Sequence, residues 1–423
     1  MRIKKEVRKI VASVLAFLMV VSLIPVNSLM TKANAASKTT FEGGKTVEDG
    51  TWKGWTWNVF GSSTDVTKAF ATDTGNGGVT LEVTGDKGKI NGSASDQGLN
   101  TFLYELDKSY DFTITAQAKV DTLAANAQAA FGLTIRDNVG AHGNTAKLTA
   151  DKNNFAFVGG YGNQAASGHG NAGYKTTALA HTRLGESPEV GGTYDLAIQK
   201  VGDSVKLYFN GEVAAECSAD DLITDNAMYV GLFAARNAKV TFNNVKLAYT
   251  QDSSSVKVTT NVTAPKKTTY CAGNTYEDVD LTGFKATVSV DGKEREITAS
   301  DCVVDMSNDP FAEVTDAGKL NLLYLGQTIE VPITVIKEVV SDMYIEYMPV
   351  KTDYMVTDTA LDFTGLVGKV VYNSGRTFDL KTLIDSNDTN TKVSDVDFTT
   401  AGNKEVTVSH TYGDVTKEVV IPI

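Results

Sequence analysis

Hydrophobic and polar positions alternate with a period of two through residues 194–247. Tyr194, Leu196 and Ile198 are separated by single polar or small residues, and the alternation continues at 205–209. A period of two is typical of strands with one buried face. The pairs at 202–203 and 210–211 contain glycine, which tolerates the positive φ of tight turns. The pattern predicts four or five short strands that close a β-sandwich.

The same alternation occurs earlier in the chain, at residues 78–84, 112–120 and 130–136. Glycines separate these runs, and proline is almost absent from them. About 210 residues of short strands fit one double-sheet jelly roll of the lectin-like kind. We therefore predict a jelly-roll domain over residues 36–250, followed by a polar linker at 251–255.

The remaining chain repeats itself with a period of about 83 residues. Residues 279–283 match 361–365, and the hairpin sequence at 290–293 matches 373–376. Alternation runs through both units, so each predicts a small antiparallel sandwich. We place these domains at 256–337 and 338–423, joined without a flexible spacer as a fairly stiff pair. The predicted fold class is all-β throughout.

Residues 1–35 have the pattern of a secretory signal peptide. Basic residues crowd the first ten positions, an apolar run follows at 10–24, and small residues stand at 33–35. An uncleaved N-terminal anchor is the alternative, although this apolar run is short for a membrane span. We expect a secreted or cell-surface protein without stable membrane insertion after cleavage.

The charge of the chain narrows the classes of partner. Removal of residues 1–35, which hold six basic residues and one acid, takes the formal net charge from −12 to −17. A chain this acidic repels nucleic acid and anionic membrane surfaces. We therefore expect no nucleic-acid partner.

The cysteines and acidic residues give little indication of a disulfide framework or a catalytic site. Cys217, Cys271 and Cys302 are too few for a disulfide framework, although the last two share a predicted domain and either pair or stay free. Glu105 and Asp107 are the nearest paired carboxylates, and glycosidases use such pairs. The third acid of the jelly-roll glycosidase pattern is missing, so we expect no catalytic residues.

Both C-terminal units resemble the bacterial immunoglobulin-like repeats of secreted and surface proteins. The matching features are the Thr-Gly turn at 282–283 and 364–365, the glycine hairpins at 290–293 and 373–376, and a late Ala-Gly. This resemblance implies two immunoglobulin-like β-sandwiches that act as a stalk, and it says little about activity.

The first domain resembles the concanavalin A-like jelly-roll modules found beside pectate lyases of Gram-positive bacteria. Four motifs carry the resemblance, at residues 58–64, 88–99, 131–137 and 229–242. In those relatives the catalytic part is usually a separate parallel β-helix, and this chain shows no such repeat. The resemblance implies a glycan-directed accessory module, with pectin or another plant-type polysaccharide as its partner.

Trp52, Trp55 and Trp57 are the first candidates for binding a glycan. They are the only tryptophans in the chain. Sugars stack their C–H faces on aromatic rings, and exposed rings in a secreted protein often bind something. The alternative is an edge strand that buries Trp55 and Trp57 on one face.

A segment rich in glycine, asparagine and aromatic residues, 155–181, is the second candidate. Tyr161, Asn163, His169 and Tyr174 would supply the rings and polar groups that recognise sugar hydroxyls, and loops at the rim of a sandwich often carry function. The alternative is a surface loop without a ligand. Arg136 is a further candidate, either lining a concave site or closing the sheet edge in a salt bridge.

We thus expect a secreted, non-catalytic polysaccharide-binding protein, with a jelly-roll head on an immunoglobulin-like stalk and possible cell-wall association. An adhesin that binds a protein partner is the main alternative, and a glycosidase using Glu105 and Asp107 is the third. Structural calcium is a further expectation, since jelly rolls often hold it through carboxylates and carbonyls.

Overall fold

The computed structural model describes residues 39–90, 97–126, 128–149, 153–162, 170–175, 179–185 and 187–423. The predicted signal peptide, Asn163 and His169 lie outside these residues. Strands make up 53% of the structure and helices 6%, which confirms the all-β fold class. No helix in the described ranges is long and apolar enough to cross a membrane.

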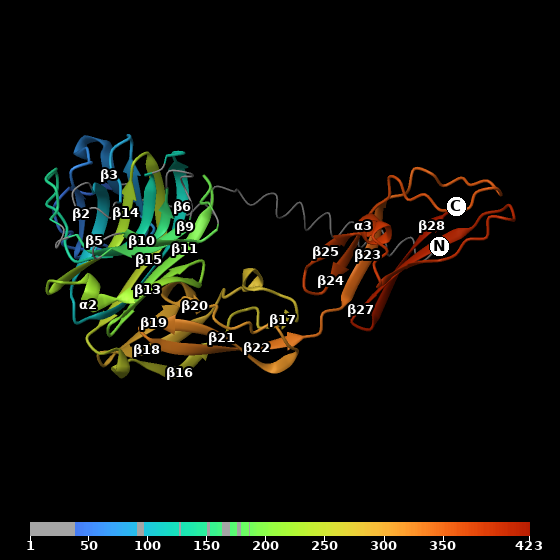
Figure 1. The fold of residues 1–423 in the computed structure, drawn as a ribbon. Helices are drawn as coiled ribbons and strands as arrows, with labels where there is room; N and C mark the ends of the chain where they lie inside the picture. The colour runs from blue at the N-terminus through green and yellow to red at the C-terminus, as the bar shows by residue number, and fades with distance from the viewer. Residues whose placement is uncertain are drawn as a thin grey trace, which may run out of the picture.

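The N-terminal domain is a sandwich of two antiparallel sheets (Figure 1). Within the described residues, sheet A has the order β1 (Thr39–Thr40), β3 (Ala69–Asp73), β4 (Val79–Val83), β15 (Ala238–Thr250), β6 (Asp111–Leu123), β11 (Thr193–Val201), β12 (Ser204–Phe209) and β13 (Glu212–Ser218). Sheet B has the order β10 (Leu179–Arg183), β9 (Gly170–Lys175), β8 (Phe155–Tyr161), β7 (Ala130–Arg136), β14 (Ala227–Ala235), β5 (Leu99–Asp107) and β2 (Trp55–Phe60).

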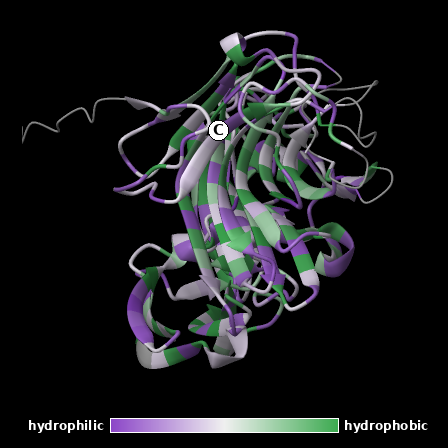
Figure 2. Ribbon diagram, turned by 90° about the vertical axis from the view of Figure 1, so that its left-hand side faces the viewer, coloured by the Kyte–Doolittle hydropathy of each residue, from purple (hydrophilic) through white to green (hydrophobic). Residues whose placement is uncertain are grey.

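The main hydrophobic core lies between sheets A and B. Alternation places side chains on the two faces of each strand, and Figure 2 shows hydrophobic and hydrophilic bands alternating along the strands. In β6, Phe112, Ile114 and Ala116 belong to this core. Thr115 and Gln117 therefore face outward, and the outer face of sheet A becomes available for other contacts.

The next domain, which we call the first sandwich, packs two small sheets around its own core. One sheet has the order β16 (Lys257–Thr263), β18 (Lys285–Val290) and β19 (Lys293–Thr298). The other has the order β17 (Thr269–Cys271), β22 (Gln327–Ile336), β21 (Thr315–Tyr324) and β20 (Val303–Asp305). The pairing of β17 with β22 is parallel.

The last domain, the second sandwich, repeats this plan with two three-stranded sheets in the described residues. They are β23 (Val340–Tyr347), β24 (Val367–Tyr372) and β25 (Thr377–Asp379), then β26 (Thr391–Val393), β27 (Glu405–Tyr412) and β28 (Val415–Pro422). A short helix, α3 (Leu380–Asp385), stands where the first sandwich has the turn η7 (Ala299–Asp301).

The sequence repeat is also a repeat of contacts. The backbone N–H of Asp280 donates to the Tyr270 hydroxyl at 3.3 Å, and that of Asp362 donates to the Tyr354 hydroxyl at 2.9 Å. A lysine three residues before each tyrosine lies 4.6 and 4.5 Å from the ring centroid. The two sandwiches therefore use matched residues to hold the same loop.

The first sandwich is docked against the outer face of sheet A. The Thr115 hydroxyl donates to the Ser300 carbonyl at 2.7 Å, and the backbone N–H of Leu325 donates to the Thr113 hydroxyl at 3.1 Å. A small hydrophobic cluster joins the two domains: Ala197, Tyr208, Val303 and Leu323. The polar segment expected as a linker forms a 3-10 turn, η5 (Ser253–Ser255), whose first carbonyl accepts from Gln327.

The joint between the two sandwiches is held by side chains. Glu338 is buried and pairs with Arg376, which donates from Nε at 2.8 Å and also from Nη2. The amide of Asn373 donates to the Lys337 carbonyl at 3.1 Å. These contacts join the two sandwiches directly, and the stiffness expected from the absence of a spacer stays a prediction.

Candidate functional site

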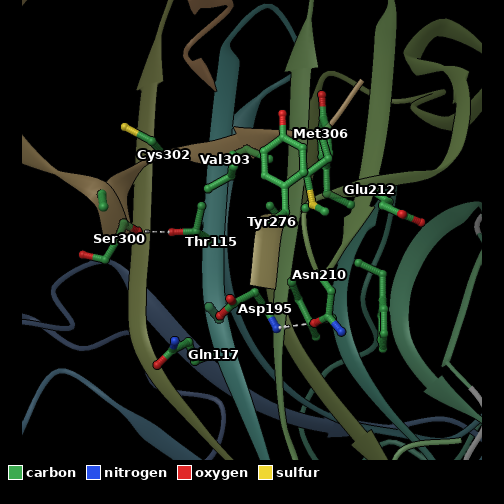
Figure 3. Close-up of a pocket in the computed structure, with 18 of the residues that line it drawn as sticks. Thr115, Gln117, Asp195, Asn210, Glu212, Tyr276, Ser300, Cys302, Val303 and Met306 are labelled. Atoms are coloured by element: carbon green, nitrogen blue, oxygen red, sulfur yellow. Dashed lines mark hydrogen bonds between the residues drawn. The ribbon is translucent and has the colours of Figure 1, made fainter. Parts of the chain in front are cut away.

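A groove lies where the jelly roll meets the first sandwich (Figure 3). Its volume is about 750 Å³. One wall is the outer face of sheet A, with the turn between β12 and β13, and the other wall is the first sandwich. The polar side chains that line it include Gln117, Asp195, Asn210, Glu212, Asn244 and Glu277.

The jelly-roll wall is built by strand alternation and one hairpin. Asp195 lies on β11 between the core residues Tyr194 and Leu196, so its side chain points outward. Asn210 adopts a positive φ of 48° in the β12–β13 turn, and its side-chain oxygen accepts from the backbone N–H of Asp195 at 3.0 Å. This bond fixes the amide at the mouth of the groove.

Two further amides stand on neighbouring strands of the same face. The Asn244 side chain donates to Gln117 Oε1 at 3.2 Å, which links β15 to β6. Asn244 is exposed and Gln117 is half-buried. Each retains free donor or acceptor capacity, because a side-chain amide has two donors and an acceptor oxygen.

The opposite wall presents Tyr276 and Met306 (Figure 3). The Tyr276 hydroxyl lies 3.0 Å from the Asp305 carbonyl and 2.7 Å from the Asn308 carbonyl. Burial, together with the nearby carboxylates of Asp305 and Asp309, raises the pKa of Tyr276 to about 12. The phenol is therefore neutral at physiological pH, and its ring forms a fixed part of the wall.

The groove combines an apolar lining with planar amides and carboxylates. Its apolar members include Ala197, Val213, Val279, Leu281 and Met306. Such surroundings suit a ligand with apolar faces and many hydroxyls, because amides both donate and accept and carboxylates accept. The contacts that dock the domains also hold both walls in place.

The groove residues were missed at the level of sequence. The alternation identifies Asp195 and Gln117 as outward-facing, and residues 210–211 as a turn, but it does not show which domain covers that face. The hydrogen bond between Thr115 and Ser300 joins residues that are 185 positions apart, so no local pattern in the sequence indicates it.

The three tryptophans predicted as a stacking surface lie in the core. Their exposed fractions are 4% for Trp52, 6% for Trp55 and 7% for Trp57. Trp55 stacks on Phe102 with ring centroids 5.2 Å apart, and Trp52 meets both rings edge-on. β2 is an edge strand of sheet B, as the alternative expected, and the buried rings stabilise the sandwich instead of facing solvent.

Trp57 takes part in a buried polar network that joins the two sheets. Its Nε1 donates to Asn100 Oδ1 at 2.7 Å. The Asn100 amide in turn donates to the carbonyls of Phe70 at 2.8 Å and Glu82 at 3.1 Å, which belong to β3 and β4. One asparagine thus ties an edge strand of sheet B to sheet A.

Arg136 is fully buried on the outer face of sheet B. Its Nη2 donates to Gln97 at 2.9 Å and Asn153 at 2.8 Å. Its guanidinium carbon lies 5.1 Å from the Phe155 ring centroid and 5.6 Å from that of Phe60. Burial lowers the pKa of Arg136 to about 10. Its side chain is enclosed, so it offers no open surface to a polymer.

The structure does not bring Tyr161 and Tyr174 together. Tyr161 packs with the cluster on the outer face of sheet B, 5.8 Å from the Phe157 ring centroid. Tyr174 packs against the core between the sheets, on the opposite face. Burial raises the pKa of Tyr161. The other two candidates of this segment, Asn163 and His169, lie outside the described residues.

Glu105 and Asp107 are exposed at the end of β5. Asp107 accepts from the hydroxyl and backbone N–H of Ser109, and these bonds lower its pKa. A lowered pKa suits a turn-forming carboxylate and is opposite to what a general acid needs.

In the described ranges, no three His, Cys, Asp or Glu residues group as metal ligands, and Cys217, Cys271 and Cys302 are free. Structural calcium stays a prediction.

Comparison with known proteins gives one significant sequence relative. No family model matches the chain. The chain is 29% identical over 327 residues to Pectate lyase L of Thermoclostridium stercorarium, a match that covers 76% of this chain and 24% of that protein. The chain therefore spans about a quarter of the relative's length.

Solved structures give distant likenesses. A carbohydrate-binding module, CBM66 from Bacillus subtilis, matches with a TM-score of 0.29 and 17% identity, over 49% of this chain and 98% of that chain. The lectin UEA-II complexed with galactose matches with a TM-score of 0.31 and 12% identity, over 50% and 98%. At these scores the likenesses say nothing about a ligand.

Proposed function

We propose that this is an exported polysaccharide-binding protein whose site is the groove between the jelly roll and the first sandwich. The groove carries the proposal: about 750 Å³ of space, lined by fixed amides, carboxylates and apolar side chains. The sequence match to a pectate lyase supports a polysaccharide as the ligand. No catalytic constellation is part of the proposal.

The two domains act together in this proposal. The first sandwich supplies Tyr276 and Met306, and the jelly roll supplies the amides. A preformed site loses little conformational entropy on binding, which favours affinity. The first sandwich is then a wall of the site as well as a spacer, and the second sandwich extends the stalk.

The finer expectations from sequence remain proposals. A plant-type polysaccharide is the ligand class that the relative's name supports, with association at the cell wall and export directed by residues 1–35. Calcium would act, if bound, as a structural ion in the jelly roll.

The test is binding of the mature chain, residues 36–423, to a panel of insoluble and arrayed polysaccharides, with calcium and with chelator. A Gln117→Ala/Glu212→Ala variant removes two polar side chains from the groove and should weaken binding at least tenfold. Glu105→Ala, which changes another exposed glutamate, on sheet B, is the control and should bind as the wild type does. Binding that survives the groove variant would place the site elsewhere.

Adhesion to a protein is a second candidate, favoured by one observation. The second sandwich exposes large apolar side chains around the end of β23, with exposed fractions of 68% for Tyr347, 82% for Val350 and 72% for Met355. Clustered apolar exposure often marks a protein contact. If the mature chain binds no polysaccharide in the panel, this surface becomes the leading site.

A further inference from the structure

The charged side chains in the described groove lining are all acidic. Asp195, Glu212 and Glu277 bring three exposed carboxylates to its lining, and the described lining contains no lysine, arginine or histidine. Lys119 and Lys246 lie on the same outer face of sheet A, on β6 and β15, but they are not part of the lining. The lining itself therefore presents net negative charge to a ligand, and Lys119 and Lys246 stand beside it, opposite the lining residues Thr193 and Thr115 in the strand register.

We propose that the groove takes a neutral glycan segment, one that presents hydroxyl groups only, and discriminates against uronate residues. This inference rests on the proposed function above. Hydroxyl groups donate to carboxylates in short, charge-assisted bonds. Asn210 and Gln117 add amides that can donate or accept. A neutral sugar thus satisfies the polar side chains without placing like charges together.

A uronate polymer meets two electrostatic obstacles. Within the groove, each ligand carboxylate comes close to Asp195 or Glu212, and like-charge contacts of this kind are a common means of rejecting a wrong partner. At longer range, the chain has a formal net charge of −12, or −17 without residues 1–35, which slows the approach of a polyanion. Salt weakens this long-range term, because the Debye length is about 8 Å at 0.15 M ionic strength.

The experiment compares galactan and xyloglucan, as neutral probes, with polygalacturonate. Binding of the mature chain is measured by affinity electrophoresis at 50 and 500 mM NaCl, in chelator and in millimolar calcium. We expect a neutral probe to bind with less than a twofold change between the salt concentrations. Polygalacturonate in chelator should bind at least tenfold more weakly than the better neutral probe.

An Asp195→Asn/Glu212→Gln variant tests the cause. It keeps the size and shape of both side chains, replaces one acceptor oxygen of each with an amide donor, and removes two charges. We expect at least a threefold gain in polygalacturonate binding at 50 mM NaCl. Neutral binding should weaken, because charge-assisted bonds from sugar hydroxyls to the carboxylates become weaker bonds to amides, so the preference for the neutral probe falls. Glu105→Gln/Asp107→Asn is the control for net charge, because it also removes two carboxylates, both on sheet B, and should give no comparable gain.

The outcomes separate this inference from the proposed function. Groove-dependent binding of polygalacturonate in chelator, tighter than that of the neutral probes, overturns the inference and leaves polysaccharide binding intact. Polygalacturonate binding that appears only with calcium and is lost in the double variant also overturns it, because the carboxylates would then hold a bridging cation. Absence of binding to every polysaccharide overturns both proposals.

Discussion

Asn100 shows how single buried polar residues specify this sandwich. Its side chain satisfies the Trp57 indole and two backbone carbonyls in a position where water has no access. A buried polar group contributes modest stability when paired but costs much more when its partner is removed. The network therefore fixes the position of edge strand β2 on the core more specifically than hydrophobic packing alone.

Replacing Asn100 with alanine should lower the free energy of unfolding by about 3 kcal/mol, since it leaves one donor and two acceptors without partners. Denaturant unfolding followed by tryptophan fluorescence measures the change. Asn58→Ala, on the neighbouring strand β2 and half-buried, is the control and should cost less than about 1 kcal/mol. Equal costs for the two variants would mean that the network contributes little.

At the scale of elements, the β12–β13 hairpin links the jelly roll to the first sandwich. Gly211 has a φ of 85°, and a Cβ atom there would lie 2.4 Å from the Met306 sulfur. The turn thus needs glycine for its backbone and also for contact with the second wall of the groove. The neighbouring β11–β12 hairpin has Gly202 at a φ of 56°, with no atom near an added Cβ.

These two glycines form a matched pair of tests. Gly202→Ala should cost about 1 kcal/mol of stability, because only the left-handed backbone is strained. Gly211→Ala should cost roughly 1 kcal/mol more, since Met306 must also move. Thermal unfolding of both variants measures the difference. If the two melting temperatures agree, Met306 adapts freely and the hairpin contact does not hold the domains together.

A second difference between elements separates the two sandwiches. In the first, β17 covers the outer edge of β22 by parallel pairing. In the second, the corresponding residues 353–355 form no strand, and Met355 is largely exposed. The two tyrosines therefore keep the same hydroxyl contact, although only Tyr270 stands on a strand.

At the scale of the whole molecule, three domains are joined by contacts of different kinds. The jelly roll and first sandwich share hydrogen bonds and a hydrophobic cluster, whereas the two sandwiches meet through Glu338 and Arg376. The Glu338 side chain is 4% exposed and that of Arg376 is 46% exposed. Removal of the arginine leaves a carboxylate buried without its cation, which is costly.

Arg376→Ala should therefore loosen the joint, with a loss of about 2 kcal/mol because the arginine is partly solvated. Small-angle X-ray scattering of the mature chain should show a broader distribution of interatomic distances. Lys337→Ala breaks the neighbouring ion pair with Asp414, which is exposed on both sides, and should cost less than about 0.5 kcal/mol. A scattering profile unchanged by Arg376→Ala would contradict a joint held by this pair.

Alternation of residues along the chain predicted most of the architecture, because strand faces follow directly from a period of two. It placed β4 and β7 within one residue and β6 within three, and it found the repeat. The site could not be predicted in this way. The alternation fits Trp55 and Trp57 equally well to a surface or to a core, because their burial depends on the opposing sheet. Arg136 is enclosed by Gln97 and Asn153, which are distant in sequence.

The groove between two domains has a consequence for thermodynamic linkage. A ligand that contacts both walls binds only the docked arrangement, so its free energy of binding adds to that of docking. At a free concentration of a hundred times Kd, this linkage stabilises the docked state by roughly 2.7 kcal/mol. Tension that pulls the first sandwich away from the jelly roll would, by the same linkage, release the ligand. The proposed polysaccharide would then be held most tightly when the chain is not under load.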